Sequence, residues 1–197
     1  MVVVPRRFVG RTVVCLGSGP SLTPEDLALV AASGHPTIAV NDTYARAPWA
    51  DVIFAADPAW WHQHPIALLH PATKYTLEYG APVGVLRLVR TGQTGLERAP
   101  YGLRSGGHSG YAAVNLAFLS GARCIILLGY DMQPAADGRH HYFGDHPDGS
   151  HPRYVQWLDG YATLVHELGR EGVRLCNASR VTAITAVPRV RLEDELT

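Results

Sequence analysis

Two glycine-rich segments carry residues of this chain that are suited to binding an anion. The first, residues 17–21 (GSGPS), ends an apolar run and precedes a helix start at Thr23 and Pro24. Gly17 and Gly19 predict backbone N–H groups that face an anion at close range, because no side chain blocks the approach. The alternative is a tight strand-to-helix turn that binds no ligand.

The second segment, residues 104–110 (RSGGHSG), also leads into a predicted helix. It places His108 and Ser109 at the helix N-terminus, where unpaired N–H groups and the helix dipole favour an anion. Neither segment has the Gly-Lys-Ser/Thr sequence of a P-loop, and Leu22 stands where a dinucleotide-binding fingerprint has its third glycine. Ordinary ATP hydrolysis and dinucleotide binding are therefore disfavoured.

A third segment, residues 133–152, is crowded with Gly, Asp, His and Pro and predicts a polar lid over the site. Histidine and carboxylate groups suit several divalent metals, but the spacings here fit no zinc motif. We therefore expect no bound metal and one catalytic histidine. The residues that could have bound a metal are Asp131, His140, His141, Asp145, His146 and His151.

The elements that must position these segments alternate between strands and helices, which is typical of an α/β domain with a mostly parallel sheet. We expect a single domain over residues 1–197, with the lid as an insertion. Strands are predicted at 12–16, 37–40, 52–55, 73–77, 124–128 and 173–176, and helices at 24–32, 110–120 and 152–171.

Two apolar groups are assigned to packing. The buried face of the last helix is predicted from three- and four-residue steps. Trp60 and Trp61 could stack on a base or sugar, but paired tryptophans are more typical of a core or a subunit contact. The helix face comprises Val155, Leu158, Tyr161, Ala162, Val165 and Leu168.

Polar residues directly follow four of the predicted strands. Asn41, Asp57, Asp131 and Asn177 are examples, and parallel strands would bring them to one edge of the sheet beside residues 17–21. Any one of these residues has a local explanation, because Asn and Asp often bond to the backbone at strand ends. Four in succession indicate a polar rim around a cleft.

The composition of the chain limits the kinds of partner that we expect it to bind. The chain has 197 residues, with 17 Lys and Arg against 17 Asp and Glu, and no basic run that could follow a nucleic-acid backbone. Cys15, Cys124 and Cys176 each lie in an apolar run and are interpreted as small core residues, neither disulfides nor zinc ligands. No apolar run is long enough to span a membrane, and the cysteines are typical of a reducing compartment. We expect a soluble, cytoplasmic protein, and separately we expect it to form a homo-oligomer.

Together these motifs resemble the bacterial sialyltransferases of glycosyltransferase family 42. They are also similar to a wider group of small Rossmann-like proteins, often phage-encoded, that share a G-x-G-P-S-L loop. The resemblance rests on GSGPSL, Asn41, Asp57-Pro58 and HSGYAAVNLAFLSGARCIILLGYD at 108–131. His151 also precedes Asn177-Ala178-Ser179 at the family's interval. The fold implied is Rossmann-like, a variant of the GT-A glycosyltransferase fold.

The resemblance implies inverting, metal-independent transfer of a sugar from a CMP-sugar to an acceptor hydroxyl, with no further cofactor. His151 would be the general base, since a histidine suits this work near neutrality. Tyr142 would donate to the departing phosphate, with Tyr130 a possible second donor. The residues implied in donor binding are Gly17, Ser18, Gly19, Pro20, Ser21, Asn41, Asp57, Ser109, Gly110 and Asp131.

One departure from the family pattern bears on the donor. Asp57 stands where the family has asparagine, and a carboxylate there would repel the carboxylate of sialic acid, so the donor sugar is expected to differ. Two other functions stay open. Archaeal pterin diphosphokinase-like proteins share the loop and use Mg²⁺ and ATP, and a nucleotide-binding phage accessory protein would need neither His151 nor Tyr142.

Overall fold

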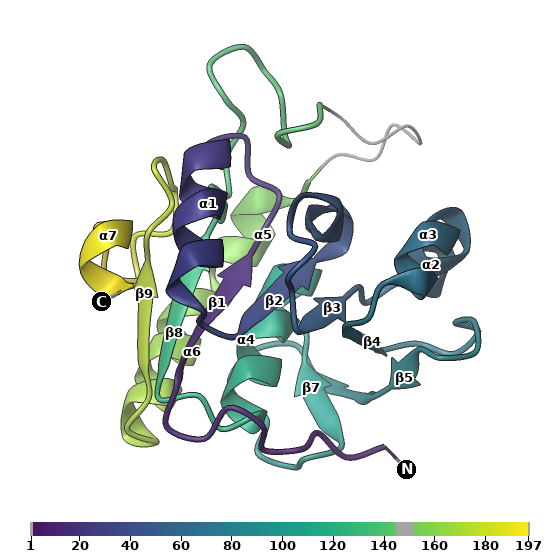
Figure 1. Cartoon of the computed structure of the whole chain (residues 1–197). Coiled ribbons are helices and arrows are strands. Elements are labelled where there is room, and N and C mark those ends of the chain that lie inside the picture. Colours follow the sequence, from purple (N-terminus) through teal and green to yellow (C-terminus); the bar gives the residue numbers. More distant parts are fainter. Residues whose placement is uncertain (1, 145–151, 197) are drawn as a thin grey trace.

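The fold is built on a seven-stranded parallel sheet. The structure is a computed structural model and describes residues 2–144 and 152–196 (Figure 1). Within this part of the chain every pair of neighbouring strands is parallel, in the order β5-β4-β3-β2-β1-β8-β9. The strands are β1 (Thr12–Leu16), β2 (Thr37–Val40), β3 (Val52–Phe54), β4 (Thr73–Thr76), β5 (Leu86–Arg87), β8 (Cys124–Leu128) and β9 (Arg174–Asn177).

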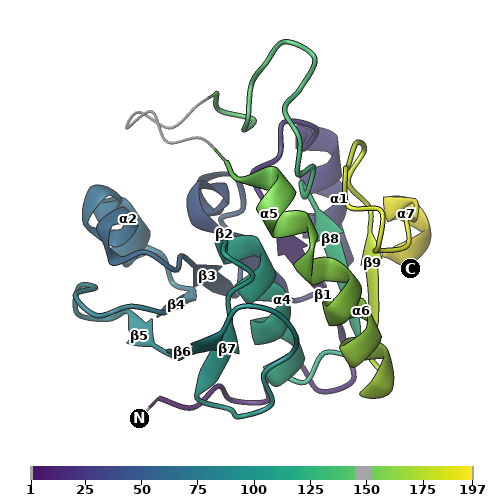
Figure 2. The same cartoon turned by 180° about the vertical axis from the view of Figure 1, so that it is seen from behind.

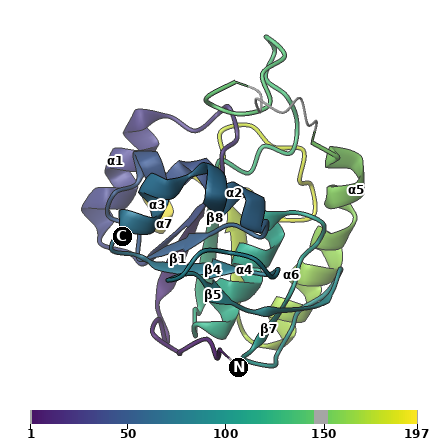
Figure 3. The ribbon, with the colours of Figure 1, turned by 90° about the vertical axis from the view of Figure 1, so that its right-hand side faces the viewer.

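Helices cover both faces of this sheet, as the side view in Figure 3 shows. Residues of α4 (Ser109–Leu119) and α6 (Gly160–Arg170) pack on one face and those of α1 (Pro24–Ser33) on the other (Figure 2). Successive residues of β1 alternate accordingly, with Val13 facing the first layer and Val14 the second. Burial on both faces explains why the strands are continuous apolar runs.

Shorter elements complete the layers. The second face also carries η1 (Asn41–Arg46), α2 (Pro58–Gln63), α3 (Pro65–Leu69) and α7 (Leu192–Glu195). A separate two-stranded parallel sheet pairs β6 (Val89–Gly92) with β7 (Gly102–Arg104), and α5 (Tyr154–Leu158) precedes α6. No helix in the described residues is both long and apolar enough to cross a membrane.

The predicted α/β class and mostly parallel sheet are confirmed, and the architecture is consistent with a Rossmann-like fold. Thr23 caps α1 as predicted, because its side chain accepts from the Asp26 N–H while the Asp26 carboxylate accepts from the Thr23 N–H. Trp60 and Trp61 are core residues around β3. The three cysteines are free and buried.

The prediction of one long helix over 152–171 is wrong. The segment forms α5 and α6, with Asp159 between them, and Val155 is 80% exposed. Ala162 is also exposed, whereas Leu164, which the predicted face left out, is fully buried. The other residues of the predicted face do pack inward, since Tyr161 and Leu168 are fully buried and Leu158 and Val165 lie against the core.

Candidate functional site

A cavity of about 620 Å³ lies at the carboxyl ends of β1, β2 and β8. Here the chain order of the strands reverses, since β2 flanks β1 on one side and β8 on the other. Ligands of open α/β sheets bind at this switch point. The lining comes from residues 17–19, 40–41, 93–94, 106–110, 129–132, 140–141, 152–154, 156–157 and 160.

The first glycine-rich segment packs tightly on the end of β8. The Gly17 N–H donates to the Leu128 carbonyl and the Gly19 N–H to the Gly129 carbonyl, both at 2.8 Å. A Cβ added at Gly19 would lie 2.2 Å from Asp131 Oδ1 and 2.6 Å from the Gly129 oxygen. The N–H groups of Gly17 and Gly19 themselves are therefore bonded to the end of β8 and do not face an anion, and the close approach of β8 requires the glycines.

Asp131 fixes the position of residues 17–21 through two hydrogen bonds to Ser21. Its side chain is buried, and its two carboxylate oxygens accept from the backbone N–H and the hydroxyl of Ser21, each at 2.8 Å. Burial raises the pKa of the Asp131 carboxyl, and the two hydrogen bonds from Ser21 act in the opposite direction. Asp131 thus braces the segment rather than presenting a free carboxylate to a ligand.

The second glycine-rich segment opens onto the cavity as the start of α4. Ser109 and Gly110 are its first helical residues, and both line the cavity. Their backbone N–H groups have no acceptor within the described residues, as expected at a helix start. The Ser109 hydroxyl accepts from the Ala56 N–H at 3.2 Å, which ties the helix start to the end of β3.

His108 is held as a neutral imidazole. Its Nδ1 accepts from the Tyr111 N–H at 3.4 Å, so Nε2 carries the proton toward the Tyr161 hydroxyl, also 3.4 Å away. The Trp157 ring lies over it with the ring centroids 5.0 Å apart. Desolvation by these neighbours lowers the pKa of His108 to about 3, although part of the ring reaches the cavity.

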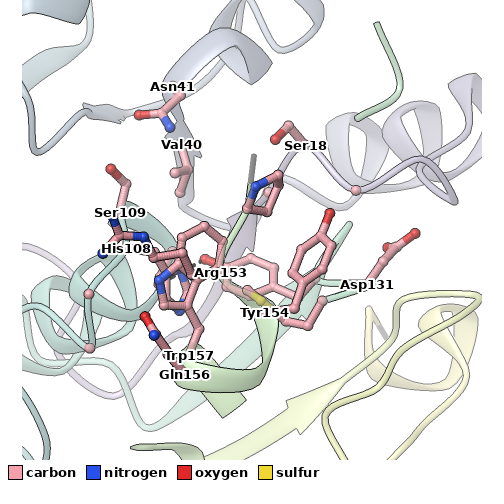
Figure 4. Close-up of a pocket in the computed structure, with 18 of the residues that line it drawn as sticks. Ser18, Val40, Asn41, His108, Ser109, Asp131, Arg153, Tyr154, Gln156 and Trp157 are labelled. Carbon is pink, nitrogen blue, oxygen red and sulfur yellow. Dashed lines mark hydrogen bonds between the residues drawn. The ribbon is translucent and has the colours of Figure 1, made fainter. Parts of the chain in front are cut away.

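One strong cation lines the described part of the cavity. Arg153 precedes α5, is exposed, and forms no ion pair with another described residue. Figure 4 shows it between the side formed by His108 and Ser109 and the side formed by Ser18 and Asp131. Because Asp131 is turned to Ser21, the electrostatics of the cavity favour an anionic ligand near Arg153 and the start of α4.

The lid segment is described up to residue 144. Ser18 is bound to it twice, since its hydroxyl lies 2.8 Å from His141 Nδ1 and its carbonyl accepts from the Tyr142 N–H at 3.0 Å. The Tyr142 hydroxyl donates to the Asp42 carbonyl at 3.1 Å, and the Arg46 guanidinium lies over its ring. Tyr142 is therefore held beside η1, outside the described lining of the cavity.

The structure thus brings together seven of the residues predicted to bind the donor. Those lining the cavity are Gly17, Ser18, Gly19, Asn41, Ser109, Gly110 and Asp131. Pro20 and Ser21 lie behind the lining, and Asp57 caps α2 by accepting from the Ala59 N–H at 2.8 Å. Of the other predicted residues, Tyr130 is a buried residue of the lining whose hydroxyl donates to the Gly110 carbonyl.

His151, the predicted base, lies outside the described residues, as do Asp145 and His146. Its neighbour Pro152 lines the cavity. Arg153, Trp157 and the pair Gln93–Thr94 were not predicted. For Arg153 and Trp157 the available signal was their position directly after the histidine-rich segment, and for Gln93 and Thr94 it was a long irregular region between strands.

No protein-family model matches the sequence, and no curated protein matches it either.

Proposed function

We propose that this protein is a glycosyltransferase that binds a nucleotide-activated sugar, with a CMP-sugar favoured, in the cavity above β1 and β8. The observation that carries the proposal is the start of α4, where Ser109 and Gly110 line the cavity together with Arg153 and their N–H groups have no acceptor among the described residues. A phosphate suits this combination of helix N-terminus and cation. The cavity volume of about 620 Å³ falls within the range of roughly 300–1,000 Å³ usual for small-ligand sites.

Sugar transfer with inversion needs two kinds of help from the protein. A base must remove the proton of the acceptor hydroxyl as that oxygen attacks the anomeric carbon, and donors must stabilise the phosphate that departs. In the proposal the donors are the Ser109 and Gly110 N–H groups and the Arg153 guanidinium, which act where negative charge develops. Tyr142 would join them only if its hydroxyl left the Asp42 carbonyl.

The base in the proposal is His151, the residue implied by the resemblance. His108 is unsuited to this role, since its pKa of about 3 makes it a weak base and its Nδ1 already accepts a hydrogen bond. Trp157 lines the cavity with its ring tilted against His108, a position that suits contact with the base or sugar of the donor. None of these steps requires a metal.

A second candidate is a nucleotide-binding protein without turnover. It is favoured by the fact that His108, one of the histidines of the described lining, is a weak base with a pKa of about 3. A pterin diphosphokinase-like reaction receives less support. Such a reaction needs carboxylates free for Mg²⁺, and Asp131, the acidic residue of the described lining, is engaged with Ser21.

The test has two stages. Thermal shifts with CMP, UDP, GDP and ADP identify the nucleotide, because a ligand that binds only the folded state raises the melting temperature. Release of that nucleotide from its sugar conjugates is then measured for the wild type, for His151→Ala, and for His166→Ala as a control. His166 is an exposed histidine of α6 outside the cavity.

The proposal expects His151→Ala to keep nucleotide binding and lose release, and His166→Ala to match the wild type. Undiminished release by His151→Ala would remove His151 as the base. Tight binding with no release from any conjugate would leave the binding protein as the better account. Turnover that needs ATP and stops with a chelator would favour the diphosphokinase.

A further inference from the structure

Two cysteines and a glutamate meet on the α1 side of the sheet, away from the cavity. Cys124 is the first residue of β8, at the opposite end of that strand from the cavity, and Cys176 lies in the neighbouring strand β9. Glu195 is the last residue of α7, which lies beside β9 in Figure 1. The two Sγ atoms and a carboxylate oxygen all lie within 4.8 Å of one another.

The strand register brings the two thiols together. Cys124 is paired with Arg174, and Cys176 with Ile126, so the cysteines occupy diagonal positions on adjacent parallel strands. Both thiols are free. A tetrahedral Zn²⁺ with Zn–S bonds of ~2.3 Å holds two sulfurs just under 4 Å apart, which is compatible with Sγ atoms that lie within 4.8 Å of each other.

The carboxylate is already oriented toward this position. Arg174 donates to both oxygens of Glu195, with Nη1 3.0 Å from Oε1 and Nη2 bonded to Oε2. Each carboxylate oxygen has a second lone pair, so these bonds leave acceptor capacity for a cation. Hydrogen bonds that fix the orientation of a ligand are a regular feature of metal sites.

The burial of the three groups fits an ion that enters from one side. Cys124 and Cys176 are 9% and 1% exposed, while the Glu195 side chain is 14% exposed. The sulfurs are thus shielded from water, and the carboxylate lies where the site meets the surface. Two thiolates and one carboxylate make three ligands, which leaves a fourth tetrahedral position for a water molecule.

We propose that Cys124, Cys176 and Glu195 bind a thiophilic divalent cation of the Zn²⁺ type. The cation would join β8, β9 and α7 and so fix the C-terminal helix to the sheet. This replaces the interpretation of Cys124 and Cys176 as inert core residues. It is independent of the proposed sugar transfer, because none of the three residues lines the cavity.

The test is a titration of the reduced full-length protein with Cd²⁺, which reports thiolate ligation through an ultraviolet sulfur-to-cadmium absorption band. We expect saturation at one equivalent. Cys124→Ser and Cys176→Ser should each reduce the band to about half, since each removes one of two thiolates. Cys15→Ser, in the core on the other face of the sheet, is the matched control and should leave the band unchanged.

Zn²⁺ affinity, measured by competition with a chromophoric chelator, tests the third ligand. Glu195→Gln should weaken binding by at least about 10-fold, because even groups that only orient metal ligands are worth on the order of 10- to 100-fold in affinity. Absence of a thiolate band would overturn the proposal. A band that keeps its full intensity in Cys124→Ser and in Cys176→Ser would overturn it as well. Cation binding by the histidine-rich segment would give no thiolate band and so is distinguished.

A second measurement needs no variant and covers the case in which a serine variant fails to fold. Alkylation of the wild type is followed at each cysteine by mass spectrometry, with Zn²⁺ or with Mg²⁺ present. Zn²⁺ should slow modification of Cys124 and Cys176 and leave Cys15 unaffected, while Mg²⁺, which prefers oxygen ligands, should protect none. Equal rates with the two cations would refute the site.

Discussion

The bracing of residues 17–21 by Asp131 gives the sharpest prediction for stability. Asp131→Ala removes both acceptors of Ser21 and leaves its partly buried backbone N–H without a partner. An unsatisfied buried donor costs about 1–3 kcal/mol, and the lost bond from the Ser21 hydroxyl adds about 1 kcal/mol. Some of this is recovered, because burial of the carboxylate is itself unfavourable, as its raised pKa shows. The two costs sum to about 2–4 kcal/mol, and the recovered desolvation brings the expected loss in the free energy of unfolding down to about 1–3 kcal/mol.

Asp131→Asn separates hydrogen bonding from charge. The amide oxygen can accept from the Ser21 N–H while the amide nitrogen donates to the Ser21 hydroxyl, so both contacts survive in a neutral form. We expect a loss of less than about 1 kcal/mol. The assay is urea unfolding with the slope compared between variants, together with hydrogen exchange of the Ser21 amide, which should lose protection only in Asp131→Ala.

Asp137→Ala is the control, because Asp137 is an exposed aspartate of the same loop that contacts only Arg139 among the described residues. It should unfold like the wild type. If Asp131→Asn lost as much stability as Asp131→Ala, the charge itself would be needed, and bracing would not explain the residue. A fully stable Asp131→Ala would refute the reasoning altogether.

Three further predictions follow from the cavity walls. Gly19→Ala should destabilise the fold by at least about 1–3 kcal/mol in urea unfolding, because its Cβ meets Asp131 and Gly129; Gly169→Ala, in open space on α6, should gain about 0.5–1 kcal/mol. His108, whose pKa falls from 6.5 to about 3 on folding, contributes stability that is complete above pH 6.5 and is lost as the pH falls toward 3, because the unfolded chain then binds the proton. Unfolding is measured from pH 7 to 4, and the free energy of unfolding should fall by at most about 1.4 kcal/mol per pH unit on account of His108. His108→Asn should remove this contribution, and equal slopes in the two proteins would contradict the prediction. Nucleotide binding should change tryptophan fluorescence in the wild type but not in Trp157→Phe, since Trp157 lines the cavity and Trp49, Trp60 and Trp61 are absent from its described lining.

Much of the fold could be predicted because it follows from local patterns. Buried parallel strands are continuous apolar runs, and the strands beginning at Thr12, Thr37 and Cys124 end where predicted. The strands β6 and β7 were not predicted, since β6 contains polar residues such as Arg90 and Thr91 and forms no apolar run. The break between α5 and α6 at Asp159 was also missed, because the spacing of apolar residues predicts a buried helix face but not where one helix ends and the next begins.

The site was predicted in outline, and its details depend on contacts between distant segments. Asn41, Ser109 and Asp131 were placed at one edge of the sheet because parallel strands share a direction. Sequence alone could not decide whether Gly19 leaves room for a ligand or for the end of β8, since either close contact requires a residue without a side chain. Asp57 was predicted to bind the donor, but in the structure its side chain caps the N-terminus of α2. This is the local role that Asp often has after a strand.

The proximity of Cys124 to Cys176 could not be predicted from the sequence, for a different reason. The two residues lack the short spacing of a metal-binding motif, and only the adjacency of β8 and β9 brings them together. Glu195 reaches them because α7 folds back onto the sheet after a loop. Such a cluster depends on the register of two strands, which composition and periodicity do not determine.

The central claim is that a nucleotide phosphate binds at the start of α4, and an NMR titration of the labelled protein with CMP tests it most directly. The account predicts saturable shifts of the backbone amides of Ser109 and Gly110 and of the Trp157 indole N–H, with no shift at Cys176 on the far side of the sheet. Saturable binding of CMP, or of any of UDP, GDP and ADP, that left the amides of Ser109 and Gly110 unmoved would contradict it, as would the absence of binding by all four.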